Sequence, residues 1–361
     1  MINRLCIGLG NAGATIVREI ADRSILDDVK LYAIDSTTTN ATIHTTRDVN
    51  YLCTISDEDQ GSGRDRERGA AMYRYHESNG DFDEMYSDAI DAKGPVILIT
   101  SAAGGTGSGS IVPLCKTLLG NGVEIIPVIV FPNQLDPIAY HLNANDLLIE
   151  LGEVGIATYS IFVNPANTAD YTDINNEVAN LVEIIFGKKY HATSKDSIDD
   201  SDLKHILETP GRFIALSVKA PDTNRLKKEI TRKVFSGYQP AWTDIQAQEC
   251  TFMKAFGLTS MFAADDHTEV FSELNARIPN SYDEYKNVAE EDNNGVAEAT
   301  VIIAGLPRHE VKEINTEFNE VKGISEGMTR STRPKFMKRK KATITKPQST
   351  EDGKPKFEWK E

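Results

Sequence analysis

Short apolar runs alternate with segments of helical periodicity over the first half of the chain. The apolar runs have the length and β-branched content of buried strands, and most are followed by apolar positions spaced three and four apart. The strand-like runs are residues 4–7, 29–34, 96–100, 123–131 and 159–163, and the helical patterns are residues 16–20, 66 onward, 111–119 and 142–151. This order predicts an α/β fold with a Rossmann-like parallel sheet that has helices on both faces.

The second half repeats the alternation after a long helical segment. Residues 173–186 carry apolar side chains on one face, and a polar segment follows at 190–202. Further strand-like runs at 213–218, 253–261 and 300–304, with a helical pattern at 311–321, predict a second α/β block. We therefore expect four parts, namely residues 1–172, a central helix at 173–190, a second domain at 191–327 and a tail at 328–361.

Charge is distributed unevenly along the chain. The formal net charge is −15, but residues 328–361 hold 11 Lys or Arg against 4 Asp or Glu, which leaves +7 on the tail and −22 on residues 1–327. The tail is also poor in aliphatic residues, so we expect it to lack a core and to be disordered. A basic tail on an acidic body predicts that the tail meets an anionic partner.

The composition favours a cytoplasmic protein with no membrane contact. No apolar stretch approaches the about 20 residues that cross a bilayer, and the first residues lack the pattern of a signal peptide. The four cysteines are scattered without the spacing of a metal site or a disulfide framework. We expect no metal-ligating side chains and a reducing compartment.

A glycine-rich segment, Ala103 to Ser110, lies between the strand-like run at 96–100 and the helical pattern at 111–119. Such a turn is typical of an anion site, since glycines let backbone N–H groups approach phosphate oxygens and the helix dipole adds positive potential. No lysine follows the last glycine, so this is not the G-x-x-x-x-G-K-[ST] loop. A flexible linker is the alternative, but linkers do not join a buried strand to a helix.

The N-terminal segment has two interpretations. Gly8 to Gly13 matches G-x-G-x-x-G between a strand and a helix, and Asp35 ends the next strand. This pattern predicts a dinucleotide site and an NAD-dependent oxidoreductase. However, that interpretation leaves the glycine segments at 61–63 and 104–110 without a role, whereas several such loops suit one nucleoside triphosphate.

Taken together, these loops resemble the tubulin/FtsZ superfamily of polymerising GTPases. The run from Ala103 to Gly109 matches the family's signature, and the other loops occur in the family's order. The resemblance implies binding of GTP and GDP by residues 1–172, and hydrolysis supported by an activation domain within residues 191–327. The residues that it assigns to the phosphates are Gly10, Asn11, Ala12, Gly61, Ser62, Gly63, Gly104, Gly105, Thr106, Gly107 and Ser108. Asp35, the acidic ribose ligand of the dinucleotide pattern, is kept as a further nucleotide-binding candidate.

The base end of the nucleotide is assigned from the same resemblance. Tyr171 and Asn175 match the opening of tubulin's central helix, where an aromatic ring stacks on guanine and an Asn bonds its edge. Their spacing places both on one helix face. Tyr171 as a partly buried core residue is an equally good interpretation of that position alone. Asn164 matches a base or ribose contact, and Asp136 is a further ribose candidate.

The catalytic residues implied by the resemblance are Asp199 and Asp202. They occupy the acidic positions of a loop, N-x-D-x-x-D/E in the family, that one subunit inserts into its neighbour's site, with Ser197 here in place of Asn. A second D-x-x-D, Asp170 to Asp173, precedes the long helix. The resemblance thus implies head-to-tail filaments in which GTP hydrolysis is completed by the adjacent subunit, with Mg²⁺ held by phosphate oxygens and water.

The tail suggests one branch of the superfamily. Residues 335–341 form a basic cluster with interleaved apolar side chains, and an aromatic pair lies near the C-terminus. A short basic tail resembles the TubZ family of plasmid and phage-plasmid partition tubulins, which implies a DNA-bound adaptor protein as partner and DNA segregation as function. Direct DNA contact, a different cytoskeletal task such as phage centring or septation, and a merely solvated tail are the alternatives.

Overall fold

The computed structural model describes residues 4–23, 29–37, 50–54, 61–133, 135–165, 171–186, 200–240, 253–259, 264–277, 283–289 and 296–308. The chain divides into two units, residues 1–311 and 312–361, and every described residue belongs to the first. The predicted helix at 311–321 and the tail at 328–361 lie outside the described residues. The predicted domain boundaries therefore remain predictions.

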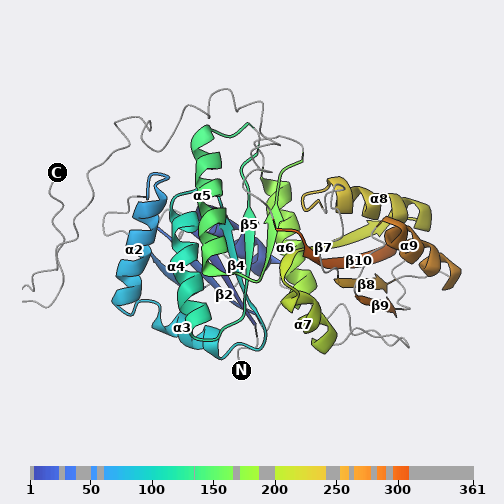
Figure 1. Cartoon of the computed structure of the whole chain (residues 1–361), viewed down its shortest axis with the longest axis horizontal. Coiled ribbons are helices and arrows are strands. Elements are labelled where there is room, and N and C mark those ends of the chain that lie inside the picture. Colours follow the sequence, from blue (N-terminus) through green and yellow to red (C-terminus); the bar gives the residue numbers. More distant parts are fainter. Residues whose placement is uncertain are drawn as a thin grey trace, which may run out of the picture. The chain divides into compact units, whose positions relative to one another are not determined.

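The described strands form one sheet in the order β3-β2-β1-β4-β5-β6-β7-β10-β8-β9 (Figure 1). Neighbouring strands are parallel from β3 to β7, whereas β10 is antiparallel to both β7 and β8. The strands are β1 (Arg4–Leu9), β2 (Val29–Asp35), β3 (Asn50–Thr54), β4 (Val96–Ser101), β5 (Ile125–Val130), β6 (Thr158–Phe162), β7 (Gly211–Ala220), β8 (Met253–Thr259), β9 (Asp283–Ala289) and β10 (Ala297–Leu306).

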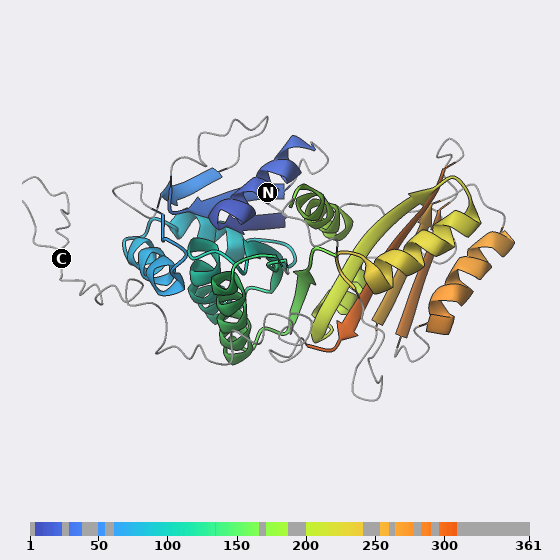
Figure 2. The same cartoon turned by 90° about the horizontal axis from the view of Figure 1, so that it is seen from above.

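Helices lie on both faces of this sheet (Figure 2), as the alternating sequence pattern predicts. Helix α1 packs on β1, β2 and β4 and against α6, while α4 packs against α2 and α5. The helices are α1 (Gly10–Asp22), α2 (Arg66–Ser78), α3 (Asp83–Ile90), α4 (Thr106–Gly120), α5 (Ile138–Val154), α6 (Thr172–Phe186), α7 (Asp200–Glu208), α8 (Thr223–Ser236) and α9 (Ala264–Arg277).

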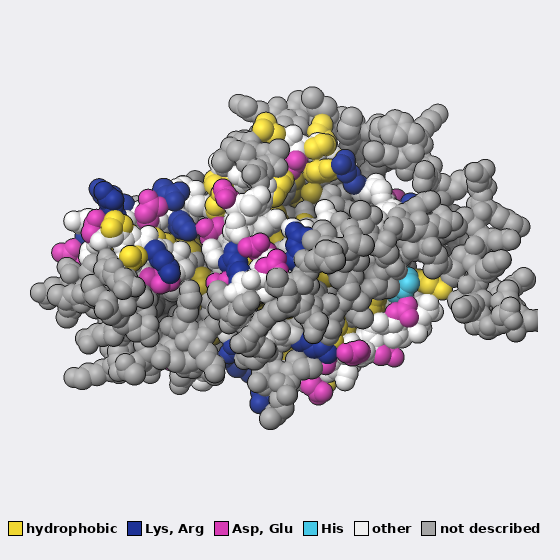
Figure 3. All heavy atoms as spheres, turned by 180° about the vertical axis from the view of Figure 1, so that it is seen from behind, with side chains coloured by type: hydrophobic (Ala, Val, Ile, Leu, Met, Phe, Trp, Pro, Cys, Tyr) yellow, Lys and Arg dark blue, Asp and Glu magenta, His cyan; other side chains and the backbone are white. Residues whose placement is uncertain are grey.

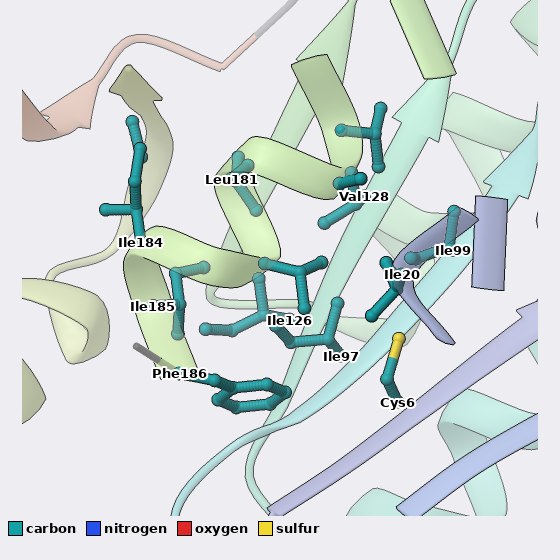
Figure 4. Close-up of a cluster of buried hydrophobic side chains, with 14 of the residues drawn as sticks. Cys6, Ile20, Ile97, Ile99, Ile126, Val128, Leu181, Ile184, Ile185 and Phe186 are labelled. Atoms are coloured by element: carbon teal, nitrogen blue, oxygen red, sulfur yellow. The ribbon is translucent and has the colours of Figure 1, made fainter. Parts of the chain in front are cut away.

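The main core lies between the parallel strands and helices α1 and α6. Strand residues two positions apart, such as Ile97 and Ile99 in β4, point to the same face and meet Ile20 of α1 (Figure 4). Helix α6 buries Leu181 and Ile185 in the same cluster, which also includes side chains of α7, β7 and β10. Because α6 is buried on the side facing the sheet, it connects the two predicted halves through shared apolar contacts.

A second core cluster lies farther along the sheet. It joins β7 and β10 to α8 and α9 through side chains such as Leu216, Ile230, Leu274 and Val301. This cluster confirms the second α/β block that the pattern at 213–218 and 300–304 predicts. Most residues of α8 and α9 are polar, and their few apolar side chains are separated along the sequence. A search for hydrophobic runs therefore does not identify these two helices.

Polar contacts also join α1 to α6. The Arg23 guanidinium donates to the Asn180 side chain at 2.6 Å and to Asn176 Oδ1 at 3.0 Å. It also lies 3.1 Å from the carboxylate of Glu183, whose residue is only 7% exposed. Removing one partner of a buried ion pair leaves the other charge buried and unpaired, which strongly destabilises the fold. Arg23 therefore fastens the C-terminal end of α1 to the middle of α6.

Most predicted elements have close to the observed bounds. Helix α5 begins four residues before the predicted start at 142, because Pro137 at the N-cap and the half-buried residues after it extend the apolar helix face. Helix α6 ends at Phe186, and residues 187–199 lie outside the described part of the chain. Helix α7 begins at Asp200, inside the segment that was expected to be a polar loop.

Charged side chains of both signs are interspersed on the described part of the face shown in Figure 3. Within the described ranges, none of the helices has the length and apolar character required to cross a membrane.

The central helix offers a direct test of the shared core. Leu181→Ala removes a side chain with 0% exposure from the main cluster, so we expect the free energy of unfolding to fall by about 2–5 kcal/mol. Leu119→Ala on α4, where the leucine is 38% exposed, is the matched control and should change it by less than about 0.5 kcal/mol. Urea denaturation followed by circular dichroism measures both. Equal midpoints for the two variants would contradict this core assignment.

Candidate functional site

Three predicted phosphate segments meet at the carboxyl edge of the parallel sheet. In the register of the sheet, Leu9 at the end of β1 is paired with Ile34 of β2 and with Thr100 of β4, so the turns that follow these strands begin at one level. Gly10 has a φ of +69°, and a Cβ on it would lie 2.8 Å from the Gly107 backbone nitrogen. The 10–12 turn and the 104–108 turn are therefore in direct contact.

Hydroxyl groups connect these turns to the 61–63 segment. Thr106 Oγ1 lies 2.7 Å from Ser36 Oγ and donates to Ser62 Oγ at 3.0 Å. All three hydroxyl-bearing residues are buried, and the adjacent carboxylate of Asp35 accepts the Ser36 N–H at 2.7 Å. The structure thus brings Asp35, Ser62 and Thr106 together, and it adds Ser36, which the sequence patterns did not single out.

The glycines of the 104–109 run have different structural roles. A Cβ on Gly107 would overlap the Leu9 carbonyl oxygen, and one on Gly105 would lie 2.5 Å from the Asp65 nitrogen. These two positions are glycine because the backbones of neighbouring segments touch them. In contrast, Gly104 and Gly63 have no described atom within 4 Å of a built Cβ. Among the described glycines of the phosphate segments, these two are the ones that leave open space beside the backbone.

Ser108 contributes to the shape of the turn. Its hydroxyl donates to the Gly104 carbonyl, and the residue is fully buried at 0% exposure. The glycine turn is thus closed by its own serine. Asn11 and Ala12, in contrast, lie in the first turn of α1 and are exposed and half-buried respectively.

Asn143 of α5 is a residue that sequence reasoning missed. It is 6% exposed, and its amide nitrogen donates to the Ala103 carbonyl at 2.9 Å and to the Arg64 carbonyl at 3.1 Å. A single buried amide therefore joins the 61–65 segment to the glycine turn. The available signal was an asparagine on the apolar side of a helix, which is too common to identify such a contact.

Arg66 links the segment at 61–65 to helix α5 and to the glycine turn. Its guanidinium makes two bonds to the Glu150 carboxylate, at 3.1 Å and 2.9 Å, and a third to the Ser108 carbonyl at 3.1 Å. Bidentate pairs of this kind combine charge with fixed geometry. Helices α2 and α5 are thereby held across the start of α4.

The predicted base end lies beside the loop that follows β5. The Tyr171 hydroxyl donates to the carboxylate of Asp136, which also accepts the Asn133 N–H at 3.0 Å. Burial, and then the bond to Asp136, raise the pKa of the Tyr171 hydroxyl well above its usual value. Burial also disfavours the charged form of the His141 ring and so lowers the pKa of that histidine. Two predicted contacts, Asp136 and Tyr171, are therefore neighbours.

The predicted spacing of Tyr171 and Asn175 is confirmed by the backbone. The Asn175 N–H donates to the Tyr171 carbonyl at 2.9 Å, which is one helical turn at the start of α6. Tyr171 is half-buried and packs against the main core cluster, so its two interpretations are not exclusive. Asn164 follows β6 at 3% exposure, on the same edge as the other turns.

Asp202 lies at the opposite edge of the sheet. Its helix, α7, is held there by Lys204, which pairs with Glu124 just before β5 at 3.4 Å. Thr158, the first residue of β6, donates to the Thr209 carbonyl at 3.0 Å, just beyond the end of α7. Asp202 belongs to the first turn of a helix, and the prediction of a loop was wrong at this position. Asp199 lies outside the described residues.

The structure matches many solved structures of one superfamily. TubZ of Clostridium botulinum phage c-st aligns with a TM-score of 0.67 at 14% identity, covering 90% of this chain and 99% of that one. A GTPγS-bound protofilament of CetZ2 from Haloferax volcanii aligns with 0.69 at 17%, covering 90% and 99%. FtsZ of M. jannaschii aligns with 0.64 at 16%, covering 84% and 88%.

These likenesses establish the class of the fold. The chain has the tubulin/FtsZ superfamily fold, as the sequence resemblance predicted. TubZ structures are among its matches, including that of Bacillus thuringiensis serovar israelensis with a TM-score of 0.68. No protein-family model matches the chain, and a search of curated proteins finds no match.

Two glycines of the same turn should respond differently to one methyl group. We expect Gly107→Ala to lower the free energy of unfolding by about 2 kcal/mol, because the new Cβ overlaps the Leu9 carbonyl. Gly104→Ala meets open space and should change it by less than about 0.5 kcal/mol. Thermal denaturation of both variants compares them. A larger loss of unfolding free energy in Gly104→Ala than in Gly107→Ala would contradict the conclusion that contacts within the fold require glycine at 107 but not at 104.

Proposed function

We propose that this chain is a polymerising GTPase whose site is completed by the next copy in a filament. One observation carries the proposal: the phosphate segments meet at the carboxyl edge of the sheet, whereas the helix with Asp202 is attached at the amino edge. The two halves of such a site cannot meet within one copy. A contact between different surfaces of identical chains does not close on itself and produces a filament.

In this proposal the triphosphate of GTP lies along the open backbone at the glycine turns. Backbone N–H groups of residues 10–12, 61–63 and 104–106 bind phosphate oxygens, and the N-terminal end of α4 adds positive potential. The hydroxyl cluster of Ser36, Ser62 and Thr106 has the oxygen chemistry that suits this ligand. A Mg²⁺ ion, held by phosphate oxygens and water, would neutralise charge on the phosphates.

The base and ribose occupy the other end of this edge. Tyr171 stacks on the guanine ring and Asn175, one turn later, bonds its edge. The bond from the Tyr171 hydroxyl to Asp136 keeps the aromatic ring in one orientation, which supports stacking. Asp136 and Asn164 face the ribose. The proximity of Asp136 and Tyr171 in the structure supports their assignment to one ligand.

Hydrolysis requires a carboxylate to orient the attacking water. Asp199 and Asp202 of the next copy supply it, so turnover depends on assembly. The likeness to GTPγS-bound protofilaments of CetZ2 and TubZ supports this dependence on filaments. The turns supply the rest of the rate enhancement by positioning the phosphates and stabilising their charge, as is general for phosphoryl transfer.

We further propose that the filaments segregate plasmid or phage-plasmid DNA, with the basic tail at 328–361 binding a DNA-bound adaptor. The support is the charge of the tail and the likeness to TubZ of a phage. Another cytoskeletal role is equally consistent with the likeness to CetZ and FtsZ. Direct contact between the tail and DNA is an alternative within the first role.

The dependence on Asp202 is testable by turnover and sedimentation. We expect Asp202→Asn to lower GTP turnover by at least about 100-fold and to lengthen the lifetime of pelletable polymer, because water is no longer oriented. Asp91→Asn, an exposed position at the end of α3, is the control and should change neither. Unchanged turnover in Asp202→Asn would refute the assignment.

A mixing experiment separates a shared site from one contained in a single copy. Gly104→Leu fills the open space at the glycine turn but leaves Asp202 intact, whereas Asp202→Asn does the reverse. Mixed filaments contain joints with an intact turn facing an intact aspartate. Turnover above that of either variant alone supports the proposal, and turnover equal to their average contradicts it.

Truncation tests the role of the tail. We expect a chain ending at residue 327 to polymerise and hydrolyse GTP as the full chain does, but to lose co-sedimentation with a DNA-bound adaptor protein. If duplex DNA alone co-sediments with the full chain, raising the salt concentration should remove it steeply. Undiminished co-sedimentation of the adaptor with truncated filaments would contradict the adaptor role.

A further inference from the structure

Strands β6 and β7 separate after a short contact. They are paired at Thr158 with Gly211 and at Tyr159 with Arg212. Beyond these two pairs, β6 continues beside β5 as far as Phe162, whereas β7 continues beside β10. The backbone groups along the two separating strand edges need other partners, since buried N–H and C=O groups are rarely left unpaired.

Residues 238–240, which follow α8, lie between the separating strands and are called the bridging segment here. The Gln239 side-chain oxygen accepts the Ala215 N–H of β7 at 3.0 Å, and its side-chain nitrogen donates to Ser160 Oγ of β6 at 2.5 Å. Gln239 is buried, and so is Ser160. One buried amide thus joins the two strands at the point where their own pairing has ended.

The backbone on each side of Gln239 is bonded to the same two parts of the sheet. The Tyr238 carbonyl accepts the Val163 N–H, just after β6, at 2.9 Å. The Pro240 carbonyl accepts a bond from the buried Arg212 guanidinium of β7, also at 2.9 Å. Because a buried polar group that loses its partner costs free energy, these bonds hold the bridging segment in one place.

The bridging segment also contacts the predicted base end of the nucleotide site. Val163, whose N–H binds the Tyr238 carbonyl, immediately precedes Asn164. The Tyr238 hydroxyl donates to the Asp173 carboxylate at 3.4 Å, in the first turn of α6 and two residues after Tyr171. Tyr238 also packs against the main core cluster. A single residue therefore joins the two chain segments that carry the predicted base contacts.

Helix α8 is attached to α6 close to this residue. Lys233 Nζ lies 3.0 Å from a carboxylate oxygen of Glu177, in the second turn of α6. Gly237 follows α8 directly, and a Cβ on it would lie 2.5 Å from the Lys233 carbonyl oxygen. The chain can therefore turn from α8 straight into the bridging segment. The second block reaches the predicted base end through these two neighbouring contacts.

We propose that Gln239 is a positioning residue for the guanine end of the nucleotide. This inference rests on the proposed function, and it assigns part of the nucleotide affinity to a side chain outside the residues that contact the base. By holding Tyr238 between β6 and β7, the Gln239 amide fixes the spacing between the Asn164 turn and the start of α6. GTP and GDP carry the same base, so Gln239 contributes equally to the binding of both.

Calorimetry with the full chain tests this with GDP and GTPγS as probes. Gln239→Met keeps an unbranched side chain of similar size and removes both bonds of the amide. We expect its affinities for GDP and GTPγS to fall by the same factor, about tenfold. In steady-state turnover, KM for GTP should rise about tenfold while kcat changes by less than about twofold, because the proposed catalytic carboxylates lie on the next copy.

Leu274→Ala on α9 is the matched control for a general loss of stability. Leu274 is buried in the second core cluster, whereas Tyr238 packs on the main cluster. Both Leu274→Ala and Gln239→Met should lower the midpoint of thermal denaturation, since each removes buried contacts of the second block. Leu274→Ala should nevertheless bind GDP and GTPγS within about twofold of the wild-type affinity.

Tyr238→Phe tests the same role without disturbing buried bonds. It removes an exposed bond to Asp173 and leaves the Gln239 amide in place. We expect its affinities for both nucleotides to fall by about threefold. In an Asp173→Ala background the bond is already absent, so Tyr238→Phe should cause no further loss. If Gln239→Met does not fold, this pair of variants decides the question.

The outcomes separate this inference from the proposed function. Unchanged affinities in Gln239→Met and Tyr238→Phe, or a loss confined to one nucleotide, would overturn the role of Gln239 while guanine nucleotide binding by the wild type stands. An equal loss of affinity in Leu274→Ala would do the same. Failure of the wild type to bind GDP and GTPγS overturns both, and retention of NAD in that case supports the dinucleotide interpretation.

Discussion

The candidate site depends on one close approach of backbones, where the first turn of α4 lies against the ends of β1 and β4. Gly107 has no room for a side chain because the Leu9 carbonyl and Thr100 Oγ1 occupy that space. This contact brings the turns after β1 and β4 to one point, and the hydroxyls of Ser36 and Ser62 then bond to Thr106. Without it, the glycine segments would be separate loops on one sheet edge.

Local signals in the sequence predicted much of the fold and part of the site. Apolar runs of strand length identified the parallel strands, and the spacing of Tyr171 and Asn175 placed them one turn apart, because both features depend on near neighbours in the chain. Asn143 and the pair of Arg66 with Glu150 were missed. Their partners lie 79 and 84 positions away, and no periodicity reports such contacts.

The edge at which each segment lies also required the structure. The sequence placed Asp202 in a polar loop after the central helix, but Lys204 and Thr209 attach its helix to the amino ends of β5 and β6. The distance between the two edges follows from the parallel direction and the length of the strands rather than from any motif. An acidic pattern is common on protein surfaces and is weak evidence alone. Because this one lies at the edge opposite the glycine turns, it could reach such turns only in another copy, which supports assembly.

The two classes of glycine in the 104–109 run have a consequence for the comparison of distant relatives. Gly105 and Gly107 are required by contacts within the fold, so selection for folding alone would preserve them in a descendant that no longer binds nucleotide. Gly104 is under no such requirement. In a divergent lineage, the first position of the run to change after loss of the ligand should therefore be Gly104, and a signature that weights all glycines equally would not register that change.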